Sequence, residues 1–108
     1  MAYKDFVEAL FKKLDTPAAT LHHAATGMAG EAGEFLDASK KPWAYGKALD
    51  LDNCIEELGD LRFYYQAALN HLGLTDEQVI QANIEKLNKR YPDKVYKDEH
   101  AIARLDKQ

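Results

Sequence analysis

Apolar residues recur at steps of three and four along most of this 108-residue chain. Such spacing places them on one side of an α-helix, because a helix completes a turn in about 3.6 residues. The sequence contains no strand-like alternation of apolar and polar residues, no internal repeat and no low-complexity tract. We therefore expect an all-α fold, an antiparallel helical bundle of about four helices. The length suits a single domain over residues 1–108.

Capping and breaking residues divide this pattern into four predicted helices. These helices cover residues 3–14, residues 17–41, a stretch from Asp50 or Asp52 to about Leu72, and residues 75–91. Each of the last three follows a side chain that can cap free N–H groups: Thr16 or Asp15, Asp50 or Asp52, and Thr75 in a capping box. Pro42 and Gly73 favour helix ends, so residues 43–47 are predicted to form a loop. Residues 93–108 are predicted to be a mostly polar tail.

The charged and sulfur-containing side chains exclude several classes of protein. The net charge of −4 argues against a protein that coats nucleic acid, because such domains are usually basic. The single cysteine, Cys54, excludes an internal disulfide and a cysteine-based zinc finger. No apolar run approaches the roughly 18 residues of a membrane span, and the acidic Asp5 lies where a signal peptide would be apolar. We expect a cytoplasmic protein without a membrane or nucleic-acid partner.

Two pairs of acidic residues lie inside predicted helices at a spacing of three. Glu31 and Glu34 belong to the second helix, and Glu57 and Asp60 to the third. Residues three apart are neighbours on a helix surface, so the four carboxylates converge if these helices pack side by side. Crowded like charges repel one another and require a cation. Carboxylate oxygens without His or Cys favour Mg²⁺, with Mn²⁺ as a substitute. The alternative is two ordinary solvated acidic faces.

Glycines inside the same helices favour the metal site. Gly27, Gly30 and Gly33 lie near the first acid pair, and Gly59 lies within the second. Each lowers helix stability by about 1 kcal/mol relative to alanine. Their presence therefore predicts a close approach of the two helices beside the acid pairs, which a solvated face does not need.

A polar, basic stripe is predicted on the fourth helix. Asn83, Lys86 and Arg90 follow one another at steps of three and four residues. Arg can bind phosphate oxygens through two hydrogen bonds and Lys can bind them as a point charge. The alternative is a solvated face balanced by Glu85 and Asp93, but beside a carboxylate metal site phosphate binding is the better interpretation.

Three motifs link these residues. They are Gly30-Glu31-Ala32-Gly33-Glu34, Glu56-Glu57-Leu58-Gly59-Asp60-Leu61 and Asn83-x-x-Lys86-Leu87-x-x-Arg90-Tyr91-Pro92. Together, over residues 21–92, they resemble the MazG-like, all-α nucleotide pyrophosphohydrolases. The resemblance implies that the chain hydrolyses (deoxy)nucleoside triphosphates to nucleoside monophosphate and pyrophosphate with Mg²⁺.

The resemblance also implies a role for each motif residue. It makes metal ligands, and hence catalytic residues, of Glu31, Glu34, Glu57 and Asp60. It makes phosphate contacts of Lys86 and Arg90, with Asn83 nearby. A carboxylate not fully engaged by metal would orient or deprotonate the attacking water, and we assign that role to Glu34. Metal and the basic stripe would neutralise the departing pyrophosphate.

Base recognition and assembly rest on apolar and aromatic side chains. Trp43 and Tyr45 can stack on a base or close the end of the bundle, and His22 can line the nucleotide cavity or lie exposed. Apolar groups outside the main stripes, such as Leu36 and Phe63, predict a partner surface. The resemblance likewise implies dimers or tetramers, so we expect a homodimer or homotetramer.

Other functions are compatible with parts of the pattern. A di-iron oxidase would need Glu-x-x-His pairs, which the chain lacks. A phosphoribosyl-ATP pyrophosphatase-like enzyme would break the same kind of bond in a different substrate. A non-catalytic helical interaction module would leave the acids solvated.

Overall fold

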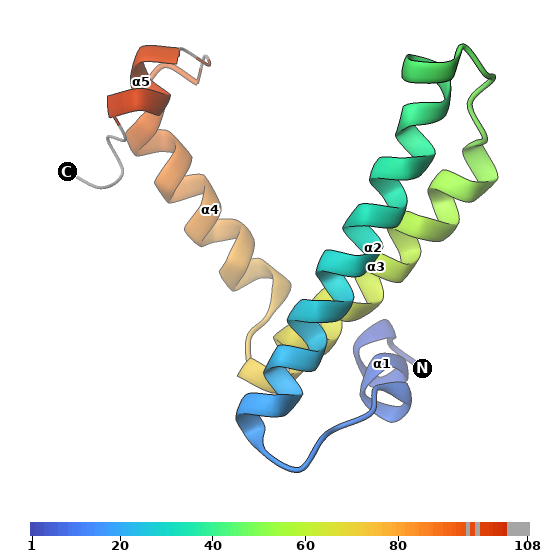
Figure 1. Ribbon diagram of the computed structural model, residues 1–108. Coiled ribbons are helices and arrows are strands. Elements are labelled where there is room, and N and C mark those ends of the chain that lie inside the picture. Colours follow the sequence, from blue (N-terminus) through green and yellow to red (C-terminus); the bar gives the residue numbers. More distant parts are fainter. Residues whose placement is uncertain (95, 97, 104–108) are drawn as a thin grey trace. The chain divides into compact units, whose positions relative to one another are not determined.

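The computed structural model describes residues 1–94, 96 and 98–103, and this part of the chain forms five helices and no strand (Figure 1). The helices are α1 (Tyr3–Leu10), α2 (Pro17–Tyr45), α3 (Leu51–Leu72), α4 (Asp76–Arg90) and α5 (Asp98–Ala103). The predicted all-α class is confirmed. Within the predicted tail, α5 is an additional short helix, and residues 95, 97 and 104–108 lie outside the described residues. No described helix is both long enough and apolar enough to cross a membrane.

Three helices begin at the predicted capping residues. The Thr16 hydroxyl accepts a hydrogen bond from the backbone N–H three residues later (3.1 Å) at the start of α2. The Asp50 carboxylate accepts the equivalent bond (3.1 Å) at the start of α3. Thr75 and Gln78 form the predicted capping box of α4, and α3 ends at Gly73, whose φ is 67°. Local hydrogen-bonding chemistry therefore sets these boundaries.

The end of α2 differs from the prediction. The helix continues through Pro42 and includes residues 43–45, which were expected to form a loop. Proline removes one backbone donor, but the residues after it still bond to preceding carbonyls. The helix ends where Gly46 adopts a left-handed φ of 62° and the Lys47 N–H donates to the Lys41 carbonyl (3.1 Å). The glycine, and not the proline, terminates α2.

The first helix is shorter than its apolar stripe. It ends at Leu10, although the stripe predicted a helix as far as residue 14. The Phe11 ring instead stacks on His23 of α2, with ring centroids 4.7 Å apart. The Leu14 N–H donates to the Thr20 hydroxyl (2.9 Å). Packing against α2 therefore replaces the last turn of the expected helix.

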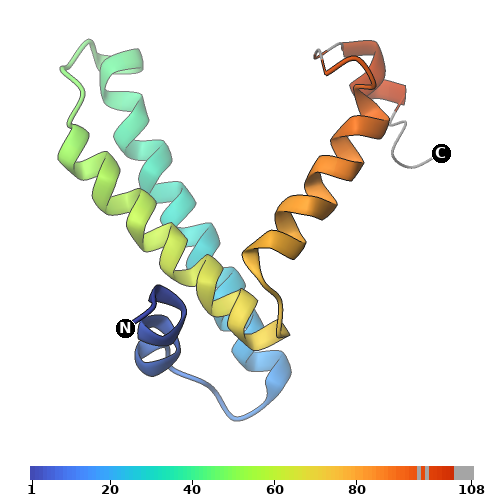
Figure 2. The same ribbon diagram turned by 180° about the vertical axis from the view of Figure 1, so that it is seen from behind.

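The first compact unit of the chain is Met1–Gly73. Here α2 and α3 lie side by side as a hairpin, and α1 packs on α3 (Figures 1 and 2). Val7 of α1 is fully buried against Ala24 of α2 and Ala67 of α3. The core of this unit is thus small and consists largely of short side chains.

The helix-interior glycines do not all have the predicted role. A Cβ atom at Gly27 would lie closer than 3.0 Å to three ring carbons of Tyr64, so α2 and α3 do approach closely at that point. A Cβ atom at Gly30, Gly33 or Gly59 would meet nothing within 4 Å. The prediction is right for Gly27 and wrong for the other three within this chain, because those three lie on exposed helix faces.

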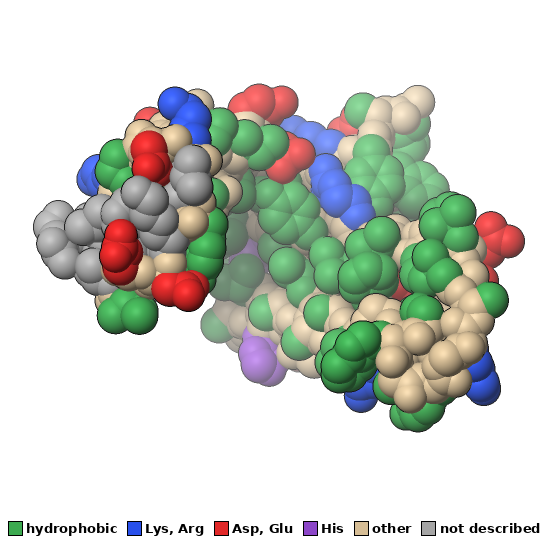
Figure 3. All heavy atoms as spheres, turned by 90° about the horizontal axis from the view of Figure 1, so that it is seen from above, with side chains coloured by type: hydrophobic (Ala, Val, Ile, Leu, Met, Phe, Trp, Pro, Cys, Tyr) green, Lys and Arg blue, Asp and Glu red, His purple; other side chains and the backbone are tan. Residues whose placement is uncertain are grey.

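Large apolar side chains of α2 and α3 remain at the surface. Leu51, Ile55 and Leu58 on α3 are 61%, 60% and 48% exposed, and Leu36 on α2 is 55% exposed. Figure 3 shows hydrophobic side chains at the surface over the end where α2 and α3 are joined. Within the described residues of this unit, these apolar side chains stay exposed.

The second compact unit is Leu74–Gln108. It contains α4 and α5, and the rings of Tyr91 and Tyr96 between them have centroids 5.3 Å apart. The Tyr96 hydroxyl donates a hydrogen bond to the Asp98 carboxylate (2.7 Å), and this bond raises the pKa of the phenol.

Candidate functional site

Three of the four predicted acids meet where α2 and α3 lie side by side. Glu31 of α2 and Glu57 and Asp60 of α3 each offer a carboxylate oxygen, and these oxygens lie within 4.8 Å of one another. Glu57 and Asp60 share a face of α3 because they are three residues apart. Glu31 and Glu57 are half-buried, whereas Asp60 is exposed. We call these three residues the acidic group.

The negative charges of this region act on Glu57. Partial burial raises the pKa of its carboxyl, and the charges of Glu31, Glu34, Asp60 and Glu56 raise it further. Both causes disfavour the ionised form of Glu57. A cation at the acidic group would remove this penalty, because an opposite charge stabilises an ionised carboxylate.

Glu34 has a different position from the other three acids. Its side chain is exposed, and it does not belong to the acidic group. Its charge nevertheless contributes to the raised pKa of Glu57, so Glu34 acts electrostatically on the group. The structure therefore brings three predicted ligands together and leaves the fourth beside them.

The donor atoms of the acidic group fit a hard divalent cation. All three donors are carboxylate oxygens, and no His or Cys belongs to the group. Such oxygen donors suit Mg²⁺ or Mn²⁺, which complete their coordination with water and substrate oxygens. The residues present therefore fit a cation of this class.

A cavity of about 320 Å³ opens beside the acidic group. Glu31 and Asp60 form its charged side, and Leu10, Phe63 and Tyr64 form its apolar side. Cavities that bind small molecules begin near this size and combine apolar walls with a few polar groups. The acidic group is thus one part of a larger site, which has a charged side and an apolar side.

Sequence reasoning missed the apolar side of this cavity. Phe63 and Tyr64 lie three and four residues after Asp60, so helical spacing alone places them one turn further along the same face. This spacing is visible in the sequence and predicts that the two rings lie beside the Asp60 carboxylate. Leu10 gives no such signal, because its position depends on how α1 packs against α3.

The residues proposed to recognise the base lie elsewhere in the first unit. Trp43 and Tyr45 are 87% and 66% exposed in the last turn of α2. At a rise of about 1.5 Å per residue, Trp43 lies about 18 Å along the helix axis from Glu31, and His22 lies about 14 Å away in the other direction. His22 is exposed. The structure does not bring these three side chains to the acidic group of the same chain.

The predicted phosphate-binding stripe lies on α4, in the second unit. Asn83 and Lys86 are exposed, and Arg90 is half-buried. Their spacing places them along one side of α4, as predicted.

One known protein family matches most of the chain. The family model of the MazG nucleotide pyrophosphohydrolase domain matches residues 19–95, a range that contains all four predicted acids and the basic stripe. No curated protein and no solved structure matches the chain. Since the match covers most of the chain and the fold is all-helical, the chain belongs to the MazG nucleotide pyrophosphohydrolase domain family.

Proposed function

We propose that this protein hydrolyses (deoxy)nucleoside triphosphates to nucleoside monophosphate and pyrophosphate in a Mg²⁺-dependent reaction. The observation that carries the proposal is the acidic group, whose three carboxylate oxygens lie within 4.8 Å of one another. This group belongs to the residues matched by a nucleotide pyrophosphohydrolase domain. A cation there would offset the charge of a triphosphate, which carboxylates alone would repel.

In the proposed site, Glu31, Glu57 and Asp60 hold the metal. When bound, the metal supplies charge neutralisation and lowers the pKa of a coordinated water. Glu34 stays outside the acidic group, so we assign it to orient the attacking water and accept its proton. The water oxygen bonds to the α-phosphorus while the bond from that phosphorus to the bridging oxygen of the β-phosphate breaks. The bridging oxygen leaves with pyrophosphate.

We assign the phosphate contacts to the basic stripe of α4. Lys86 and Arg90 supply positive charge, and Asn83 supplies an amide donor on the same side of the helix. These residues belong to the matched range, which supports a common function with the acids. Their role is to bind the triphosphate and to neutralise the pyrophosphate as it leaves.

We also propose that the protein is a homodimer or homotetramer in the cytoplasm. The exposed Leu36, Leu51, Ile55 and Leu58 support this assembly, because apolar surface of this kind favours a partner. Trp43, Tyr45 and His22 lie far from their own acidic group, so we assign them to a site that a second copy completes. Sedimentation equilibrium at micromolar concentration tests the assembly, and a single species near 12 kDa would contradict it.

The reaction is tested by pyrophosphate release from a panel of nucleoside and deoxynucleoside triphosphates with Mg²⁺. We expect release from at least one of them and none after chelation of the metal. Activity confined to phosphoribosyl-ATP would favour the phosphoribosyl-ATP pyrophosphatase alternative. No hydrolysis of any of these substrates would favour a non-catalytic helical interaction module.

A further inference from the structure

His23 of α2 is a half-buried polar side chain that the proposed metal and phosphate contacts do not use. Its ring stacks on Phe11, with ring centroids 4.7 Å apart, and meets the Tyr64 ring edge to face at 6.1 Å. A phenylalanine could make both of these contacts. The ring contacts alone therefore do not account for a histidine at this position.

One ring nitrogen anchors His23 to the segment that connects α1 with α2. The Nδ1 atom lies 3.0 Å from the backbone carbonyl oxygen of Lys12, which follows the end of α1 at Leu10. A carbonyl oxygen can only accept a hydrogen bond, so Nδ1 carries the hydrogen and donates it. This bond restricts rotation of the imidazole and fixes the ring that faces Phe11 and Tyr64.

The Tyr64 ring lies against α2 at Gly27, where an added Cβ would lie closer than 3.0 Å to three of its carbons. Gly27 lies four residues after His23 and four before Glu31, so these three residues share one face of α2. On α3, Tyr64 follows Asp60 by four residues, and it lines the cavity beside the acidic group. A shift of this ring would therefore move the wall next to Glu31 and Asp60.

The ring contacts around Tyr64 come from three parts of the chain. Phe63 meets it at 5.3 Å from the same helix, and Phe11 meets it at 6.3 Å from the connecting segment. From α2, Gly27 offers backbone only, and the ring contact is that of His23. Aromatic rings that meet edge to face hold one another in preferred positions. His23 thus limits movement of the Tyr64 ring along α2.

We propose that His23 is a positioning residue for the reaction, because its anchored ring holds Tyr64 in place beside the acidic group. The inference rests on the proposed function and adds to it a residue that does not itself line the cavity. His23 acts through Tyr64, so its replacement should alter substrate binding while every carboxylate remains present.

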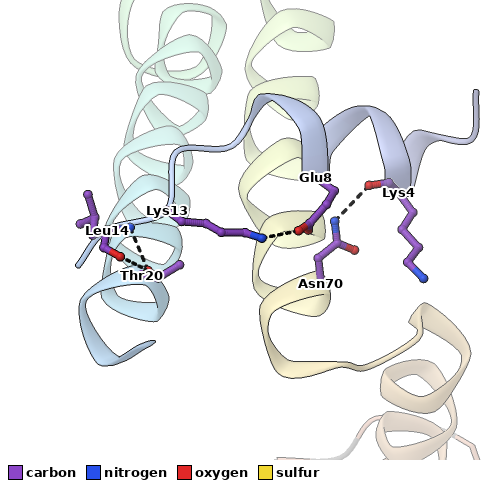
Figure 4. Close-up of polar contacts among 6 residues, drawn as sticks. All are labelled: Lys4, Glu8, Lys13, Leu14, Thr20 and Asn70. Atoms are coloured by element: carbon purple, nitrogen blue, oxygen red, sulfur yellow. Dashed lines mark hydrogen bonds and ion pairs between the residues drawn. The ribbon is translucent and has the colours of Figure 1, made fainter. Parts of the chain in front are cut away.

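Three variants separate the ring, its hydrogen bond and the connecting segment. His23→Asn keeps an amide donor near the position of Nδ1 but removes the ring, whereas His23→Phe keeps a ring and removes the donor. Thr20→Val is the matched control one turn earlier on α2. The Thr20 hydroxyl accepts a hydrogen bond from the Leu14 N–H (2.9 Å) of the same connecting segment (Figure 4). Its removal loosens that segment while the rings of His23 and Tyr64 remain.

Two measurements follow the proposed effect. NMR of protein with isotope-labelled tyrosines reports on the Tyr64 ring, and Tyr64→Phe assigns its signals. Pyrophosphate release from the panel of triphosphates with Mg²⁺ gives KM and kcat. Circular dichroism verifies that each variant is folded.

We expect His23→Asn to move the Tyr64 resonances and to raise KM by about tenfold, the lower end of what one pocket contact contributes. The change in kcat should be smaller than the change in KM, because the acids remain. His23→Phe should change both the resonances and KM less, since a ring still faces Tyr64. Thr20→Val should lower the melting temperature and leave the Tyr64 resonances and KM unaltered.

Three results would overturn the proposal. They are Tyr64 resonances or a KM that do not change in His23→Asn, equal changes in Thr20→Val, and a larger effect of His23→Phe than of His23→Asn. Equal changes in Thr20→Val would trace the effect to the loosened segment. A larger effect of His23→Phe would trace it to the hydrogen bond alone.

Failure of this inference and failure of the proposed function give different results. Hydrolysis with an unchanged KM in His23→Asn would refute the positioning role and leave the function standing. Absence of hydrolysis by the unmodified protein would refute the function. Moved Tyr64 resonances in His23→Asn would then still support the placement of Tyr64 by His23, and unmoved resonances would overturn it.

Discussion

Replacing Gly27 by alanine tests the closest approach between α2 and α3. The new Cβ would lie closer than 3.0 Å to three ring carbons of Tyr64, whereas carbon atoms in favourable contact are about 3.5–4.0 Å apart. The ring must therefore retreat by more than about 0.5 Å. Overpacking of this kind costs about 1–3 kcal/mol, and the better helix propensity of alanine returns about 1 kcal/mol. We expect a free energy of unfolding between unchanged and about 2 kcal/mol lower.

Gly30→Ala is the matched control on the same helix. A Cβ at Gly30 would meet nothing within 4 Å, so only the propensity gain of about 1 kcal/mol applies. Thermal unfolding followed by circular dichroism should give a melting temperature at least about 4 °C higher for Gly30→Ala than for Gly27→Ala. Equal stabilisation by the two substitutions would refute the argument that Tyr64 packs on the backbone of Gly27.

Three further predictions concern the charged residues. Glu34→Gln or Asp60→Asn should abolish turnover with the helical content unchanged, as measured by pyrophosphate release and circular dichroism; full activity would remove that residue from the site. Without divalent cations, Glu57→Gln should raise the melting temperature at neutral pH, because the raised pKa of Glu57 means that its ionised form destabilises the fold. This gain should shrink as the pH falls through that raised pKa and vanish below the ordinary value of 4.5; a gain that is independent of pH would contradict it. Lys86→Ala and Arg90→Ala should each weaken triphosphate binding in calorimetry while Mg²⁺ still binds, and unchanged affinity in either variant would remove that side chain from phosphate contact.

Local chemistry made much of the fold predictable. Thr16, Asp50 and Thr75 cap helices within three residues of themselves, so the sequence near each cap contains all the information that the helix start needs. The end of α2 differs from the prediction because Gly46, and not Pro42, terminates the helix. Proline removes one hydrogen bond, whereas a left-handed glycine redirects the chain.

The candidate site was predictable only where it depends on spacing within a helix. Glu57 and Asp60 share a face by their separation alone, and so do Phe63 and Tyr64 one turn later. Leu10 reaches the same cavity through tertiary packing of α1, which no local pattern reveals. The separation of Glu34 from the acidic group likewise depends on how α2 is rotated against α3.

The central claim is that the acidic group supports attack of water on the α-phosphorus of a nucleoside triphosphate. Phosphorus NMR of the reaction in water enriched in heavy oxygen tests it directly, using the best substrate of the panel and Mg²⁺. The account predicts pyrophosphate and nucleoside monophosphate as the products, with the heavy oxygen in the monophosphate, and no reaction in Asp60→Asn. Heavy oxygen in the pyrophosphate, release of nucleoside diphosphate and phosphate, or full turnover in Asp60→Asn would contradict it.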